Sequence, residues 1–172
     1  GSIAILDLGY NCQPALLAPV LDRLASFCGS SAHWGVRWDS LGLESRGVDC
    51  LAEILSCPVS IVVLAGCEGV DLNAVRGKIG CRQIFVEVRD LQEAEGAIAA
   101  GCDGLIVKGH ESAGSVSRYS SFVLLQELSG RLTVPYWVQG GIGTRSAAAV
   151  VVAGAAGVVL CEQLWLADES AI

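Results

Sequence analysis

Basic residues are scarce in this sequence of 172 residues, which has 11 lysines and arginines against 18 aspartates and glutamates. The formal net charge is -7, and no run of basic residues interleaved with aromatic residues occurs. Binding to nucleic acid depends largely on cationic side chains that release counterions from the phosphate backbone. The charge balance therefore argues against a nucleic-acid partner.

Long hydrophobic runs are also absent. The longest apolar stretches are Ser60 to Gly66 and Ala147 to Leu160, and two glycines interrupt the second. Both are shorter than the roughly 20 residues that a helix needs to cross a bilayer. No secretory signal precedes Ile3, because only the pair Gly1-Ser2, which resembles a cloning remnant, stands before it. We therefore expect a cytoplasmic protein with no membrane partner.

Paired cysteine motifs are missing although the chain has eight cysteines. No two of them have the Cys-x-x-Cys spacing that is typical of zinc sites and redox motifs. Cys102 and Cys161 lie beside apolar runs, where a reduced thiol behaves as a small hydrophobic side chain. We expect neither disulfides nor a metal site.

The remaining composition favours one well-cored domain, since 52% of the residues are hydrophobic and 17% are charged. Short apolar runs with little polar alternation recur along the chain, as expected of parallel strands that are buried on both faces. These runs are Ile3 to Leu8, His33 to Trp38, Val59 to Ala65, Gln83 to Val88, Gly104 to Val107, Val134 to Val138 and Gly157 to Leu160.

Helical stretches alternate with these runs, at Pro14 to Phe27, Asp90 to Ala100, Ser121 to Leu128 and Thr144 to Ala153. Right-handed crossovers turn this pattern into a parallel sheet, either doubly wound or closed into a barrel. No Gly-x-Gly-x-x-Gly sequence opens a helix after the first strands, so a dinucleotide-binding fingerprint is missing. We therefore predict an α/β fold of the TIM-type (β/α) barrel class.

The predicted barrel is abbreviated, because a complete one has eight strands and about 250 residues. We expect residues 1–172 to form a single barrel domain, excised from a larger protein, whose missing first strand preceded Ile3. Closure with seven strands, or an open edge covered by a partner, is the alternative. An open edge also predicts self-association into a homo-oligomer.

Polar residues with catalytic potential follow the fifth apolar run. Lys108, His110 and Glu111 stand where a barrel strand delivers side chains to its mouth, and Gly109 and Gly114 allow close approach of a ligand. A cation, an imidazole and a carboxylate at one strand end make these three residues candidate catalytic groups. The alternative for His110 is a structural role, in which it hydrogen-bonds a neighbouring loop.

A glycine-rich turn follows the sixth apolar run and precedes a helix. Gly140, Gly141 and Gly143 leave backbone amides unblocked at the positive end of that helix, which suits a phosphate group. Barrels often form a phosphate site in the loops after their last two strands. The order of the segments therefore predicts an anion site here.

These segments resemble the nitronate monooxygenase family and the flavin-dependent enoyl reductases, and are closest to the versions embedded in polyketide and polyunsaturated fatty acid synthases. The second half of the chain carries the resemblance. The similar pieces, in matching order and spacing, are Ala100 to Gly104, Lys108 to Gly114, Gln139 to Gly143 and Gly154 to Leu160.

The resemblance implies an FMN across the barrel mouth, with its phosphate on the glycine loop and on the loop opened by Cys161. Gly109, Gly114 and Gln139 then also belong to the cofactor site. It further implies an oxidoreductase-like domain that acts on an acyl or other small-molecule substrate, with the other domains of a synthase as partners.

Two positions depart from the family pattern. Ser115 stands where relatives have a histidine that serves as general base or substrate contact, and a serine needs its own activator to act as a base. Glu162 places a carboxylate after the last strand, where relatives have a Gly-Thr-Arg run. Both changes support an alternative function, a catalytically inactive barrel that serves a synthase as a structural or docking domain.

A second alternative is a phosphate-ester-binding barrel enzyme without flavin, since many barrels share the glycine loop. Such an enzyme needs charged groups at other strand ends, and Asp7, Asp39, Glu87 and Lys108 are candidates. The competing interpretation pairs the carboxylates with arginines, either Arg37 or Arg89.

Overall fold

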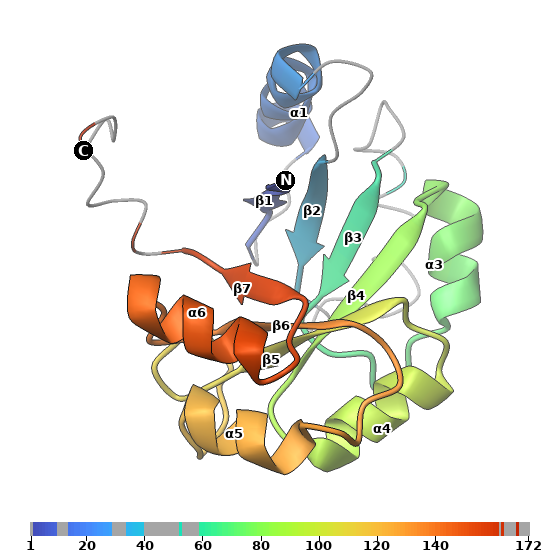
Figure 1. The fold of residues 1–172 in the computed structure, drawn as a ribbon. Helices are drawn as coiled ribbons and strands as arrows, with labels where there is room; N and C mark the ends of the chain where they lie inside the picture. Colours follow the sequence, from blue (N-terminus) through green and yellow to red (C-terminus); the bar gives the residue numbers. More distant parts are fainter. Residues whose placement is uncertain are drawn as a thin grey trace. The chain divides into compact units, whose positions relative to one another are not determined.

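The computed structural model describes residues 2–9, 14–28, 34–39, 52, 59–161, 163 and 168. Strands and helices alternate along them (Figure 1). The strands are β1 (Ala4–Asp7), β2 (Trp34–Trp38), β3 (Ile61–Leu64), β4 (Gln83–Val88), β5 (Gly104–Lys108), β6 (Tyr136–Gln139) and β7 (Gly157–Val159). The helices are α1 (Pro14–Cys28), α3 (Leu72–Ile79), α4 (Leu91–Ala99), α5 (Ser121–Leu128) and α6 (Thr144–Val152).

Each strand coincides with a predicted apolar run, and the strands are parallel and follow chain order. The predicted class, an abbreviated (β/α) barrel fold of the TIM type, is therefore confirmed. β5 and β6 run one residue further than predicted, to Lys108 and Gln139. That extension puts both side chains on strand ends rather than in loops.

Helix α3 is the one described helix that the sequence analysis did not predict. Asp71 caps it by accepting hydrogen bonds from two backbone amides at 2.9 and 3.2 Å. Leu72, Val75 and Ile79 are buried on one face, and the helix ends at Gly80, whose φ of 70° is left-handed. An N-cap, an apolar spacing and a terminal glycine were all present in the sequence as signals.

Two compact units make up the chain, and the first comprises Gly1–Glu87 and Gly96–Gly104. Its strands pair in parallel, β1 with β2, β2 with β3 and β3 with β4. All residues of β3 are buried, as is Cys102. Burial raises the pKa of the Cys102 thiol to about 11, so this cysteine stays a protonated, free thiol near neutral pH.

The second unit comprises Val88–Glu95 and Leu105–Ile172. In it β5 pairs with β6 and β6 with β7, again in parallel. Helix α5 packs against β6 and helix α6 against β7 (Figure 1). Among the described residues, none of the helices combines the length and the apolar character needed to span a bilayer.

Candidate functional site

The carboxyl ends of β5 and β6 lie side by side in the second unit. Lys108 and Gln139 are partners in the strand register, and the amide of Gly109 donates a 3.0 Å hydrogen bond to the carbonyl of Gln139. The two loops that carry the predicted site residues therefore start from adjacent positions. Parallel pairing is the reason, since it brings the carboxyl ends of neighbouring strands to one edge.

The loop after β5 folds back over Lys108, whose residue surface is only 2% exposed. The amide of Ser117 donates to the Lys108 carbonyl at 3.2 Å, and that of His110 donates to the carbonyl of Tyr119 at 2.9 Å. The Lys108 ammonium lies 3.7 Å from the position that a Cβ on Gly114 would take. Lys108 thus places a buried cation beneath the loop.

Glu111 is committed to helix α5. Its carboxylate accepts the amide of Ser121 at 3.0 Å and lies 3.4 Å from the Ser121 hydroxyl. Acidic groups at this end of a helix are favoured by the helix dipole and by the unpaired amides. A side chain on Gly109 would come within 2.4 Å of the same carboxylate, so glycine is required there. Glu111 therefore anchors the loop to the helix.

His110, the remaining candidate acid or base, is exposed. Its backbone contacts the loop, but its imidazole has no hydrogen-bond partner in the described part of the chain. The side chain is consequently available to a ligand.

The glycine loop after β6 packs against the loop after β5. A Cβ on Gly140, whose φ is 115°, would lie 2.8 Å from the Ser112 hydroxyl, which only a glycine avoids. The Ser112 hydroxyl is buried and lacks a hydrogen-bond partner. An unsatisfied buried hydroxyl is costly, so Ser112 is a group that a bound ligand could satisfy.

Helix α6 begins directly after the glycine loop. The amide of Gly143 donates to the Ser146 hydroxyl at 2.7 Å, and the first intrahelical bond runs from Ala147 to the Gly143 carbonyl at 2.8 Å. The amides of residues 144–146 precede that bond and have no carbonyl partner within the helix. They make the predicted anion-binding end of α6.

A chain of hydrogen bonds links β6 to the loop after β7. The Gln139 amide group donates to the Cys161 sulfur at 3.2 Å, the Cys161 amide donates to Gln163 at 3.1 Å, and Gln163 donates to the Ile142 carbonyl at 3.1 Å. Cys161 therefore lies beside the glycine loop. Glu162, the expected departure next to it, is outside the described residues, as is the start of the second predicted run, His33.

Ser115 is the other position that departs from the family pattern, and a residue that follows β4 binds it. Its hydroxyl accepts a 2.9 Å hydrogen bond from Arg89, which follows β4. Arg89 in turn forms an ion pair with Glu93. The serine is thereby an anchor for its loop, and among the described residues no base contacts its hydroxyl.

The charged strand ends of the first unit form a network of their own. Arg37 donates to both carboxylate oxygens of Glu87, at 2.6 and 2.9 Å, and to Asp7 at 3.1 Å. The bond to Glu87 is the main reason that the pKa of Arg37 is raised above its usual range. Arginine pairing, the competing interpretation of Glu87 and Asp7, is what the structure has, with Arg37 as the partner.

The structure thus brings together most of the predicted site residues of the second unit, namely Lys108, Gly109, Glu111, Gly114, Gln139, Gly140, Gly141, Gly143 and Cys161. The sequence analysis did not single out Ser112. Its only indication in the sequence is its place in the loop after β5, between Glu111 and Gly114. In the described part of the chain, no group of three or more His, Cys, Asp or Glu side chains is arranged to hold a metal ion.

Known protein structures share this fold. FabK from Thermotoga maritima superposes with a TM-score of 0.77 and 22% identity, over 98% of this chain and 52% of its own. Nitroalkane oxidase from Streptomyces ansochromogenes superposes with a TM-score of 0.78 and 21% identity, over 100% of this chain and 61% of its own. This chain therefore spans between half and two thirds of the length of these two proteins.

Thiamine phosphate pyrophosphorylase from Pyrococcus furiosus is also similar, with a TM-score of 0.71 and 17% identity over 97% of this chain and 76% of its own. No family model and no curated protein sequence matches the chain. At these identities the similarity establishes the fold.

Proposed function

We propose that this chain is an FMN-binding, oxidoreductase-like barrel domain of the nitronate monooxygenase and enoyl reductase type, working within a polyketide or fatty acid synthase. The observation that carries the proposal is the meeting of the glycine loop, the start of α6, and Lys108 and Ser112 at one strand edge. The similarity in fold to FabK and nitroalkane oxidase supports it.

The residues present fit the phosphate end of such a cofactor. A Cβ on Gly143 would have no atom within 4 Å, so there is open space beside the free amides of α6. The hydroxyl of Ser112 is buried next to Gly140 and supplies a donor that lacks a partner. Glu111 lies close to Gly140 and Gly141, but its carboxylate accepts the amide of Ser121.

FMN, when bound, supplies the electron and hydride transfer, and the protein supplies binding and orientation. Lys108 would hold a positive charge in a water-poor position, where its electrostatic effect is strong. His110 is the exposed group that could exchange a proton with a substrate, because Glu111 and Ser115 are both engaged in loop contacts. An acyl substrate carried by another domain suits this arrangement.

Flavin binding is the direct test. We expect the purified protein to bind FMN with saturation, as followed by quenching of flavin fluorescence and by a change in the blue absorbance band. Absence of uptake at saturating FMN contradicts the proposal.

A charge at the start of α6 tests where the phosphate binds. Gly143 has an extended backbone with a φ of -127° and room for a side chain, so Gly143→Asp and Gly143→Asn should both fold. Asp and Asn are equally good helix N-caps, and only Asp adds a negative charge. We expect G143D to bind FMN about tenfold or more weakly than G143N. Equal affinities for the two variants would place the phosphate elsewhere.

A phosphate-ester barrel without flavin is the second candidate function. The free amides of α6 accept any phosphate, and thiamine phosphate pyrophosphorylase shares the fold. A thermal-shift comparison of FMN with phosphorylated metabolites separates the two, since stabilisation by phosphate esters alone favours the second. Stabilisation by neither favours the inactive docking domain, to which the structural contacts of Ser115 and Glu111 also point.

A further inference from the structure

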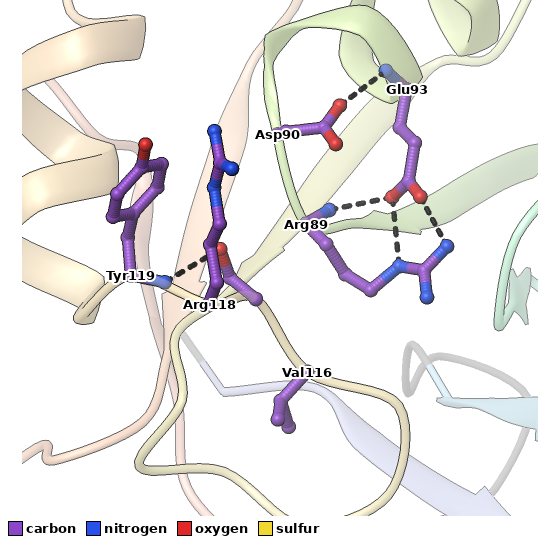
Figure 2. A pocket seen from close by; sticks show the side chains of 7 residues that line it. Arg89, Asp90, Glu93, Val116, Arg118 and Tyr119 are labelled. Carbon is purple, nitrogen blue, oxygen red and sulfur yellow. Dashed lines mark hydrogen bonds and ion pairs between the residues drawn. The ribbon is translucent and has the colours of Figure 1, made fainter.

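A pocket opens between the turn after β4 and the loop after β5, with a volume of about 420 Å³ (Figure 2). All of its lining residues belong to the second unit. They are Arg89, Asp90, Glu93, Val116, Ser117, Arg118 and Tyr119. The proposed flavin function uses none of them.

Most charged groups of this pocket are satisfied by the pocket wall. The Arg89 guanidinium is paired with the Glu93 carboxylate and also donates to Ser115. Asp90 accepts the Glu93 amide at 2.9 Å and so caps helix α4. Figure 2 shows Arg89 held against Glu93 in this way. These groups therefore have little remaining capacity for a ligand.

Arg118 is different. Its guanidinium lies 4.6 Å from the centre of the Tyr119 ring, and in the described part of the chain it has neither a hydrogen bond nor an ion pair. The backbone next to it is held in place, because Ser117 is buried and its amide donates to the Lys108 carbonyl at the end of β5. The pocket thus presents one cation, whose guanidinium has five N–H donors.

We infer that this pocket binds the carboxylate of a small organic acid, with Arg118 as its charge partner. A guanidinium recognises a carboxylate through two parallel hydrogen bonds. Glu93 forms an ion pair with Arg89 and Asp90 caps α4, so Arg118 is the cation of the lining that remains for a ligand. The two carboxylates balance the two arginines in formal charge, which limits the pocket to a ligand with a single negative charge. A doubly charged phosphate would be repelled by Asp90 and Glu93. Val116 and the Tyr119 ring offer apolar contact to a short carbon chain.

Butyrate and its neutral analogue butyramide are suitable probes for an NMR titration of the flavin-free protein. We expect butyrate to shift the amide signals of residues 116–119 with saturation, and butyramide and inorganic phosphate to bind at least about tenfold more weakly. Equal binding of butyramide, or tighter binding of phosphate, would overturn the carboxylate assignment.

Substitutions of Arg118, which is exposed, provide a second test of the inference. Arg118→Gln should weaken butyrate binding by about tenfold or more. Arg118→Lys should weaken it less, because lysine keeps the positive charge but loses the two parallel N–H donors of the guanidinium. Arg131→Gln is the matched control, since Arg131 is also exposed and lies outside the pocket. Unchanged butyrate affinity in R118Q, with an unchanged circular dichroism spectrum, contradicts the inference. The titration contains no flavin, so its outcome is independent of the FMN test.

Discussion

At the residue scale, three glutamates have three different structural roles. Glu87 is buried against Arg37, Glu93 holds Arg89, and Glu111 accepts an amide of α5. In the sequence Glu87 and Glu111 are both carboxylates near a strand end and therefore candidates for catalysis. What separates them is the partner that the fold brings near, and that partner comes from a segment up to 50 residues away.

The ion pairs of Arg37 give a prediction at this scale. Glu87→Ala should lower the free energy of unfolding by about 3 kcal/mol, because it leaves a half-buried guanidinium without its main partner. Asp7→Ala should cost less than about 1 kcal/mol, since the Asp7 side chain is 60% exposed. Urea unfolding of both variants measures the difference. A larger loss for D7A than for E87A would contradict this ranking.

At the scale of the element, a glycine inside a helix and a glycine at a helix end differ in backbone conformation. Gly77 lies within α3 and Gly96 within α4, both are exposed, and a Cβ on either would meet no atom within 4 Å. Gly80 has equally open surroundings but a φ of 70° at the end of α3. Only backbone conformation distinguishes the three positions.

Alanine substitutions separate these effects. Gly77→Ala and Gly96→Ala should each raise the free energy of unfolding by about 0.5–1 kcal/mol, because alanine loses less entropy in a helix. Gly80→Ala should lower it by about 1 kcal/mol, since a left-handed residue with a Cβ is strained. Thermal and urea unfolding provide the measurement. A stabilising G80A would show that α3 can end in another conformation.

The loops after β5 and β6 show how one element positions another. Glu111 anchors the first loop to α5, and the close contact of Gly140 with Ser112 brings the second loop against it. The candidate anion site is therefore a product of two loops, and neither would form it alone.

At the scale of the whole molecule, the edge strands of the sheet bear on how the protein could associate with another chain. In the described part of the chain, β7 hydrogen-bonds to β6 and stands last in the strand order, and Leu160 after it is 46% exposed. An uncovered strand edge is a site for pairing with another chain. Self-association through an open edge stays a prediction, and β7 is one strand on which it can be tested.

Sedimentation tests self-association directly. We expect the protein to sediment in a concentration-dependent way, as a species larger than the monomer, and Leu160→Lys to reduce this, because a lysine at an edge opposes strand pairing. Val151→Lys on α6 is the control, since Val151 is 52% exposed and belongs to a helix, which offers no strand edge for pairing. A strictly monomeric wild-type protein excludes this form of association.

The alternation of apolar runs and helical stretches was sufficient to predict the seven strands that the described residues form, and the barrel class. Helix α3 was missed although its cap and spacing are visible in the sequence, because Asn73, Arg76, Gly77 and Lys78 leave it few apolar positions. Helix α5 has the same length but is mostly apolar, and it was predicted. The glycine loop and Lys108 were identified as parts of the candidate site from the order in which strands, loops and helices follow one another in the sequence. Ser112 and Arg118 were not, because burial and the lack of a partner are properties of the folded molecule.

The sequence by itself determined the parallel βα order, since hydrophobic periodicity and turn residues act over a few neighbouring positions. Only the tertiary structure decided which carboxylates are free, because Glu87 and Glu111 meet their partners through packing between distant segments. The same holds for Arg118, which has no ion pair in the described part of the chain, whereas Arg89 pairs with Glu93. Pairing of charges depends on distances in space, and local sequence does not contain them.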